Sequence, residues 1–179
     1  MDAGQLKSAI ERVKEKYATW VLGSIGETYN ATKDAQNGST PLAAFILVSC
    51  AIDFIAGFLA GIPDFEPGSA GANYKGFVKR YMPGYDPEDV YKNIRCRLAH
   101  NYTIGGGIGL IHLNPKVHDP LGSKGNKIIN FDDFYSDFRK GAEEYFQDVE
   151  TNSALQTNFL RRYALGFADV EKIVIPETT

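Results

Sequence analysis

An apolar run between residues 41 and 61 (PLAAFILVSCAIDFIAGFLAG) constrains this chain more than any other segment. The run is long enough to span a bilayer. Its one charged residue, Asp53, lies near its centre, where a carboxylate costs about 2.5–3.5 kcal/mol to insert. Neither flank carries an excess of Lys or Arg. The segment therefore predicts the buried central helix of a soluble protein, with no membrane partner; a membrane span is the less favoured alternative.

Amphipathic helices are expected to pack around this segment. Residues 3 to about 30 repeat their apolar side chains with a helical period. Thr40 and Pro41 mark the start of the apolar helix. Asp86 followed by Pro87 is a helix start signal. Further helices are expected over residues 72–81, from 86 to about 103, over 131–146 and over 153–167, of which 131–146 carries an aromatic core stripe. The glycines at 105–107 are expected to end the fourth helix, which starts at 86.

Two short β-prone stretches interrupt the helical pattern. Residues 108–113 and 127–131 flank a turn-rich connection, which predicts a β-hairpin with a long loop. The expected fold is mainly α: an antiparallel helical bundle of four to five main helices, with a small β-hairpin inserted after the fourth. Residues 1–179 are expected to form a single domain, in which the hairpin excursion spans about 105–131 and residues 168–179 form a loosely held tail.

Charge and cysteine content limit the functional class. The net charge is −3, which disfavours a dedicated DNA-binding protein. Charge is nevertheless segregated: residues 74–102 carry six Lys or Arg against three acids, and 132–150 carry seven acids against two bases. These are either two solvated faces or a local basic patch and its counterpart. Cys50 and Cys96 are expected to be free, buried thiols, and the first 20 residues lack an apolar leader, which together favour a cytoplasmic protein.

The sequence Arg95-Cys96-Arg97-Leu98-Ala99-His100-Asn101-Tyr102 concentrates reactive side chains near the end of the expected fourth helix. A neutral histidine can take the proton from a ribose 2′-hydroxyl. Arginine can hold a phosphate and stabilise the charge that develops in the transition state. The set therefore predicts phosphodiester cleavage without a metal. The alternative is structural, because cations near a helix C-terminus favour its dipole.

Helix geometry leaves the partner of the histidine open. On an ideal α-helix, with about 100° per residue, Asn93, Arg97 and His100 share one flank, while Arg95 and Tyr102 lie on the other. Arg95 and His100 are about 140° apart, but Arg97 and His100 only about 60°. Either the helix distorts, or a second copy completes the site, or Arg97 is the partner of His100.

This sequence resembles the R-x4-6-H signature of the HEPN superfamily, and the R-x4-H-x-Y form found in HEPN toxins. The resemblance implies a metal-independent endoribonuclease with Arg95 and His100 as catalytic pair. It implies a homodimer whose motifs meet, an RNA substrate, and the toxin role in a toxin–antitoxin or defence system. Tyr102 would be the residue that an antitoxin nucleotidyltransferase modifies. The alternative is a non-catalytic HEPN-like module that binds a protein partner or a nucleotide.

Three further residues are expected to support this site. Arg97 and Asn93 are expected to help bind the substrate. Asp53 is costly to bury unpaired, so we expect it to pair with Arg95 or Arg97, or to orient His100. No cofactor and no metal are expected: the three histidines match no ligand spacing, and the glycines at 105–109 lack the Lys and Ser/Thr of a phosphate loop.

Overall fold

A computed structural model describes residues 3–33, 41–62, 69–112 and 117–166. Thr40 and the expected C-terminal tail, 168–179, lie outside the described residues. The elements in order are α1 Ala3–Lys16, η1 Tyr17–Leu22, α2 Gly23–Thr32, α3 Leu42–Ala60, α4 Ala70–Tyr81, η2 Asp89–Cys96, α5 Arg97–Asn101, β1 Ile108–Ile111, β2 Lys127–Asn130, α6 Phe131–Thr151 and α7 Ser153–Gly166. The first helix is continuous but contains a π-helical segment. So does the helix that carries Arg95 and His100, formed by η2 and α5, which we call the motif helix.

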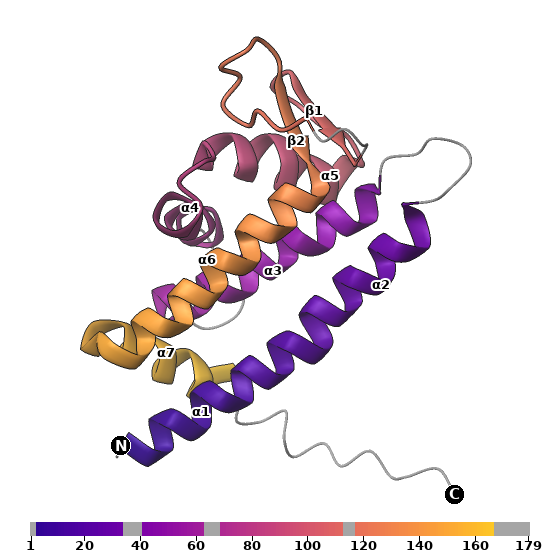
Figure 1. Cartoon of the computed structure of the whole chain (residues 1–179). Coiled ribbons are helices and arrows are strands. Elements are labelled where there is room, and N and C mark those ends of the chain that lie inside the picture. Colours follow the sequence, from indigo (N-terminus) through magenta and orange to yellow (C-terminus); the bar gives the residue numbers. More distant parts are fainter. Residues whose placement is uncertain (1–2, 34–40, 63–68, 113–116, 167–179) are drawn as a thin grey trace, which may run out of the picture.

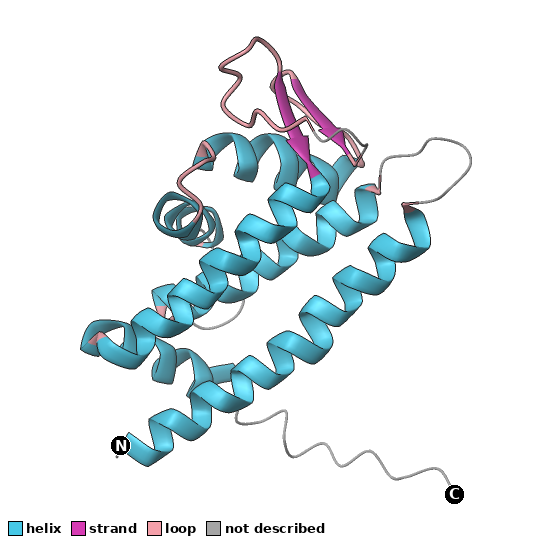
Figure 2. Ribbon diagram, in the orientation of Figure 1, coloured by secondary structure: helices cyan, strands magenta, loops and turns pink. Residues whose placement is uncertain are grey.

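Helices make up most of the molecule, and the two strands lie at one end of it (Figures 1 and 2). This confirms the mainly α fold and the position of each expected helix to within a few residues. The long helix formed by α1, η1 and α2 runs antiparallel to α3, whereas α6 runs in the same direction as α3 (Figure 1). The antiparallel order expected for the bundle therefore applies to only some of its helices.

The apolar helix α3 lies at the centre of the fold. It contacts α2, α4, α6, α7 and the motif helix η2–α5. Phe45, Val48, Ile52 and Ile55 are completely buried. α3 is long and apolar enough to cross a membrane, and it is the only such helix within the described ranges. The core helix of a soluble protein can have the same length and composition. Its packing among five neighbours is the arrangement expected for a core helix.

Aromatic side chains of α6 form a second part of the core, beside the apolar side chains of α3. Phe131, Phe134 and Phe138 are fully buried. Phe131 meets Phe45 of α3 edge to face, with ring centroids 5.1 Å apart, and Phe138 meets Tyr17 at 6.1 Å. Burial of each such ring stabilises the fold by about 1.5–3 kcal/mol. The aromatic stripe is therefore core, as its spacing indicated.

The expected hairpin is wrong in one respect: β1 and β2 are parallel, with Ile108 opposite Lys127. The connection is long enough to bring the chain back before β2 begins. A residue midway along it, Asp119, pairs antiparallel with β2 instead: the N–H groups of Asp119 and Ile128 donate to each other's carbonyls at 2.8 and 3.0 Å. The returning segment thus takes one edge of β2 and leaves the other edge to β1.

The outer side of α3 corrects another expectation. Cys50 and Cys96 are both free, but Cys50 is exposed and Cys96 is half-buried. Cys50 lies on a stripe of α3 that faces away from the neighbouring helices, together with the exposed Ala43 and the half-buried Ile46, Leu47 and Phe54. An apolar sequence without a polar face cannot show which of its sides remains uncovered. We call these five residues the outer stripe of α3.

Both ends of the motif helix are defined by local contacts. Asp86 caps its start, because its Oδ1 accepts hydrogen bonds from the backbone N–H groups of Glu88 (2.8 Å) and Asp89 (3.3 Å). Its end differs from the expectation. Tyr102, not the glycines at 105–107, takes the left-handed conformation that stops the helix, with φ 51° and ψ 32°.

Candidate functional site

The motif helix presents its polar residues on both sides of a buried apolar stripe. Val90, Ile94 and Leu98 are buried and anchor the helix to α3 and α4. From Asp89 to Cys96 the helix is π-helical. Such segments are rare and occur often at functional sites, because the wider turn shifts the side chains that follow it. Because the buried apolar stripe holds the helix in one orientation, it fixes the direction in which each polar side chain of the motif points.

Arg95 is held by the carboxylate of the central helix. Its Nε and one terminal nitrogen each lie 2.9 Å from Asp53 Oδ2, and both side chains are 26% exposed. This confirms the expected pairing of Asp53 with a motif arginine. Burial raises the pKa of Asp53, and Arg95 offsets only part of that rise. Burial also disfavours the charged Arg95, but the charge and hydrogen bond of Asp53, together with Cys96, outweigh it and keep the pKa of Arg95 above its usual value.

Asn93 and Arg97 face the loop that follows the helix. Asn93 Nδ2 donates to Asp89 Oδ1 at 2.9 Å, and Asp89 also pairs with Lys127 of β2. The backbone N–H of Gly105 donates to the carbonyl of Asn93 at 3.1 Å. A Cβ on Gly105 would lie 2.4 Å from Arg97 Nε. The loop thus lies directly on the flank that carries Asn93 and Arg97, and Asn93 is engaged in structural contacts.

His100 and Tyr102 are the open part of the motif. Both are exposed, Tyr102 at 71%. Within the described part of the chain, His100 has no hydrogen bond or ion pair. Within this chain, no hydrogen bond among the described residues joins His100 to either arginine: Arg95 is bound to Asp53, and Arg97 lies against Gly105.

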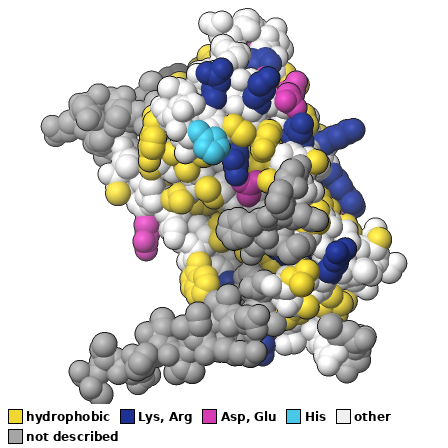
Figure 3. Space-filling model, turned by 180° about the vertical axis from the view of Figure 1, so that it is seen from behind, with side chains coloured by type: hydrophobic (Ala, Val, Ile, Leu, Met, Phe, Trp, Pro, Cys, Tyr) yellow, Lys and Arg dark blue, Asp and Glu magenta, His cyan; other side chains and the backbone are white. Residues whose placement is uncertain are grey.

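The cations around the motif divide into paired and unpaired ones. Figure 3, seen from behind Figure 1, shows one histidine among hydrophobic and Lys/Arg side chains. The paired cations of the basic segment 74–102 are Lys75 with Glu88, Arg80 with Asp148, and Arg95 with Asp53. Lys79, Lys92 and Arg97 have no ion pair with any described residue. The motif helix therefore carries two exposed cations, Lys92 and Arg97, that form no ion pair with any residue the structure describes.

A half-buried network around His118 was not foreseen from the sequence. His118 Nδ1 accepts the backbone N–H of Asn130 at 3.1 Å, so its proton lies on Nε2, which is 3.1 Å from the Tyr85 hydroxyl. Tyr85 donates in turn to Asp137 at 3.1 Å. These residues are far apart in the sequence, and no local pattern signals their contact. The network links the loop before the motif helix to the start of α6.

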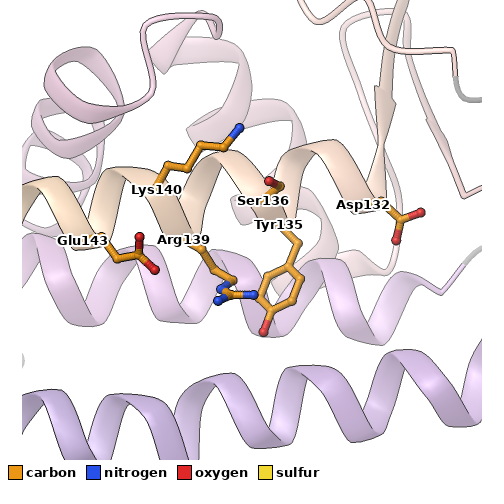
Figure 4. Close-up of a pocket in the computed structure, with 6 residues that line it drawn as sticks. All are labelled: Asp132, Tyr135, Ser136, Arg139, Lys140 and Glu143. Atoms are coloured by element: carbon orange, nitrogen blue, oxygen red, sulfur yellow. The ribbon is translucent and has the colours of Figure 1, made fainter.

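The structure gives little support to two other kinds of site, a ligand-binding groove and a metal site. A groove of about 360 Å³ lies on α6 (Figure 4), lined by Asp132, Tyr135, Ser136, Arg139, Lys140 and Glu143. Its two acids and two bases balance, and it contains no motif residue. Over the described ranges, no group of three His, Cys, Asp or Glu side chains is arranged to hold a metal ion.

In comparisons with protein-family models, curated proteins and solved structures, nothing matches this chain. The features of this chain that bear on function are therefore the motif, its contacts and its exposure.

Proposed function

We propose that this chain is a HEPN-like, metal-independent endoribonuclease that works as a cytoplasmic homodimer, the toxin half of a toxin–antitoxin or defence system. One observation carries the proposal. The arginine of the R-x4-H motif is oriented by a half-buried carboxylate from the central helix, while the histidine of the same motif is open to solvent. Cations that only favour the dipole at a helix end would not need a half-buried carboxylate of a neighbouring helix as a partner.

The proposed reaction uses the ribose 2′-hydroxyl as nucleophile. As the general base, the accessible imidazole of His100 takes the proton as the 2′-oxygen attacks phosphorus. A guanidinium stabilises the extra negative charge on the phosphorane. The P–O5′ bond then breaks, and the protonated His100 returns its proton to the leaving oxygen. The products are a 2′,3′-cyclic phosphate and a 5′-hydroxyl.

A second copy would supply the missing contact between the motif residues. Arg95 is bound to Asp53 and not to His100. We therefore assign each active site to Arg95 of one protomer and His100 of the other. The outer stripe of α3 adjoins Asp53 and offers apolar surface for this pairing. Arg97, which is free of ion pairs with described residues, would hold a substrate phosphate beside His100.

The proposal is tested by incubating the purified chain with single-stranded and structured RNA in EDTA. The unmodified protein should cleave, and His100→Ala should lower the rate at least 100-fold. His112→Ala is the matched control, because His112 lies beyond the motif and bonds to the carbonyl of Lys33. Activity that disappears in EDTA would refute the metal-independent mechanism, and equal activity of His100→Ala would refute the assigned base.

A non-catalytic HEPN-like module is the second candidate. The absence of a hydrogen bond between His100 and any described residue favours it, because catalytic bases are commonly oriented by a partner. In that case the exposed motif would bind a nucleotide or a protein, and a nucleotidyltransferase partner would act on Tyr102. No RNA cleavage by the unmodified protein, together with saturable binding of a nucleotide, would favour this candidate.

A further inference from the structure

Tyr91 of the motif helix lies beside the guanidinium that Asp53 holds. The centroid of its ring is 5.9 Å from Arg95 Cζ, a distance at which an aromatic ring attracts a cation. Two hydrogen bonds to the two oxygens of a carboxylate would fix the plane of a guanidinium. In this pair, however, both nitrogens of Arg95 reach the same oxygen of Asp53. The carboxylate therefore fixes where the group lies but leaves its plane able to turn.

The ring of Tyr91 is itself held in place by α4. It is half-buried, and its centroid lies 5.4 Å from that of the fully buried Tyr74. A Cβ on Gly71 would lie 2.8 Å from the ring and hydroxyl of Tyr91, so the ring occupies space that only a glycine leaves. Lys75 also lies over this ring, at 5.8 Å, and is paired with Glu88. The ring is thus a fixed surface against which a guanidinium can lie.

The π-helical form of the segment Asp89–Cys96 places two side chains of the motif over Tyr91. A π-helical turn closes between residues i and i+5, so the side chains at i+4 and i+5 both lie over position i. Here these are Arg95 and Cys96. Burial raises the pKa of Tyr91, and a hydrogen bond with Cys96 adds to that rise. Both residues that lie one π-helical turn ahead therefore interact with Tyr91.

We propose that Tyr91 is a positioning residue that sets the plane of the Arg95 guanidinium, while Asp53 sets its location. The inference rests on the proposed ribonuclease function, in which Arg95 stabilises the charge on the phosphorane. Arg95 is 26% exposed, so a phosphate can reach it. A guanidinium turned out of its plane would meet that phosphate with poor hydrogen-bond geometry. Tyr91 touches no reacting atom in this scheme and acts only through Arg95.

Tyr135 and Arg139 of α6 provide a matched reference pair. They are also four residues apart, Tyr135 is also half-buried, and Arg139 Cζ also lies 5.9 Å from the centroid of the tyrosine ring. Arg139 has no ion pair with any described residue, and neither residue belongs to the motif. This pair therefore reproduces the ring contact at a place where it should not affect cleavage.

The orientation of Arg95 can be measured without RNA, by NMR of the arginine side chains. In the unmodified protein the ring current of Tyr91 should shift the Arg95 side-chain protons upfield. Tyr91→Leu, which keeps an apolar side chain, should lower the order parameter of the Arg95 Nε–H bond to below about 0.6, and Tyr91→Phe should not. Arg139 should be unaffected by either substitution and should respond to Tyr135→Leu instead.

Cleavage of RNA supplies the second measurement. Tyr91→Leu should lower kcat about five- to tenfold and change KM by no more than about twofold, because the arginine is needed for the charge that develops in the transition state. Tyr91→Phe should keep kcat within about twofold of the unmodified protein, because it retains the ring. Tyr135→Leu should leave both constants unchanged. A residue that only packs α4 on the motif helix would not produce this division between kcat and KM.

The two measurements separate this inference from the proposed function. If the unmodified protein does not cleave RNA, yet Arg95 loses its order in Tyr91→Leu, the positioning role stands and the ribonuclease fails. If the unmodified protein cleaves and Tyr91→Leu cleaves equally fast, the ribonuclease stands and the positioning role fails. An Arg95 without an upfield shift in the unmodified protein, or a loss in Tyr91→Phe as large as in Tyr91→Leu, would also overturn the role of the ring. The upfield shift needs no variant, so it decides the matter even if Tyr91→Leu does not fold.

Discussion

Asp53 and Arg95 depend on each other because both lie half inside the core. Their mutual attraction compensates for water that each has lost, and it fixes the guanidinium in one place. Two nitrogens of Arg95 converge on a single carboxylate oxygen. This pair therefore has two separable roles, in stability and in the position of a proposed catalytic group.

Replacing Asp53 by Asn should show both roles. We expect a loss of about 1–2 kcal/mol in the free energy of unfolding, because Arg95 keeps its burial and loses its charged partner. RNA cleavage should fall about tenfold or more, because the guanidinium is no longer held. Urea unfolding and cleavage rates are the measurements. Asp148→Asn, which removes the partner of Arg80, is the control: full loss of cleavage there would mean that the effect is not local.

His118 predicts a pH dependence of stability. Burial lowers its pKa below 6.5, and Asp133, Asp137 and Asp119 offset part of this effect. The unfolded chain therefore binds the proton at a higher pH than the folded protein. The contribution of His118 is complete above about pH 6.5 and is lost as the pH falls below that value. Protonation also places a hydrogen on Nδ1, which can then no longer accept the Asn130 N–H.

Urea midpoints between pH 5.5 and 7.5 test this prediction. His118→Gln should be less stable than the unmodified protein at pH 7.5 and should lose less stability on acidification. His100→Gln is the control, because it also removes a histidine but lies outside the network of His118, Tyr85 and Asp137. Identical pH dependence in His118→Gln would show that this histidine does not titrate during unfolding.

At the scale of elements, the loop after the motif helix is fixed by two close approaches. Gly105 lies against Arg97, and Gly106 has φ +65° and lies against Asn93. Asn93 bonds to Asp89, which pairs with Lys127 of β2. The motif helix, the loop and the small sheet therefore form one connected unit, and a change in the loop should be felt at the motif.

Alanine at Gly106 and at Gly107 separates backbone strain from steric contact. Both residues have positive φ, so alanine costs about 1–2 kcal/mol at either position. At Gly106 the new Cβ would also lie 2.4 Å from Asn93 Nδ2, whereas at Gly107 it meets open space. We expect Gly106→Ala to be less stable than Gly107→Ala by about 1–3 kcal/mol, as measured by thermal or urea unfolding. Equal losses would mean that the loop does not pack on Asn93.

For the whole molecule, the separation of Arg95 from His100 predicts complementation between two inactive variants. Arg95→Ala and His100→Ala should each be inactive alone. When the two variants are refolded together, about half of the dimers should contain one chain of each variant. Each such dimer has one complete site out of two, so the mixture should recover about a quarter of full activity. The measurement is the cleavage rate of the mixture against either variant alone. No recovery in mixtures shown to contain mixed dimers would place Arg95 and His100 of one site in the same chain.

The sequence predicted most elements because their signals are local. The apolar run from 41 to 61 predicted the central helix, periodic aromatic residues predicted the core face of α6, and Asp86 predicted a helix start. It also predicted that Asp53 pairs with a motif arginine, because a charge on an apolar helix requires a partner. The direction of β1 was not predictable, since the competing pairing of Asp119 with β2 involves residues with no sequence signature of their own.

By itself, the sequence determined a mainly helical chain with a reactive segment near the end of one helix. Tertiary structure decided the rest. It chose Arg95 over Arg97 as the partner of Asp53, left His100 and Cys50 exposed, and joined His118 to Tyr85 and Asp137. Periodicity specifies which side of a helix is apolar, but which neighbour covers it depends on how distant segments pack. Contacts between such segments have no local period from which they could be read.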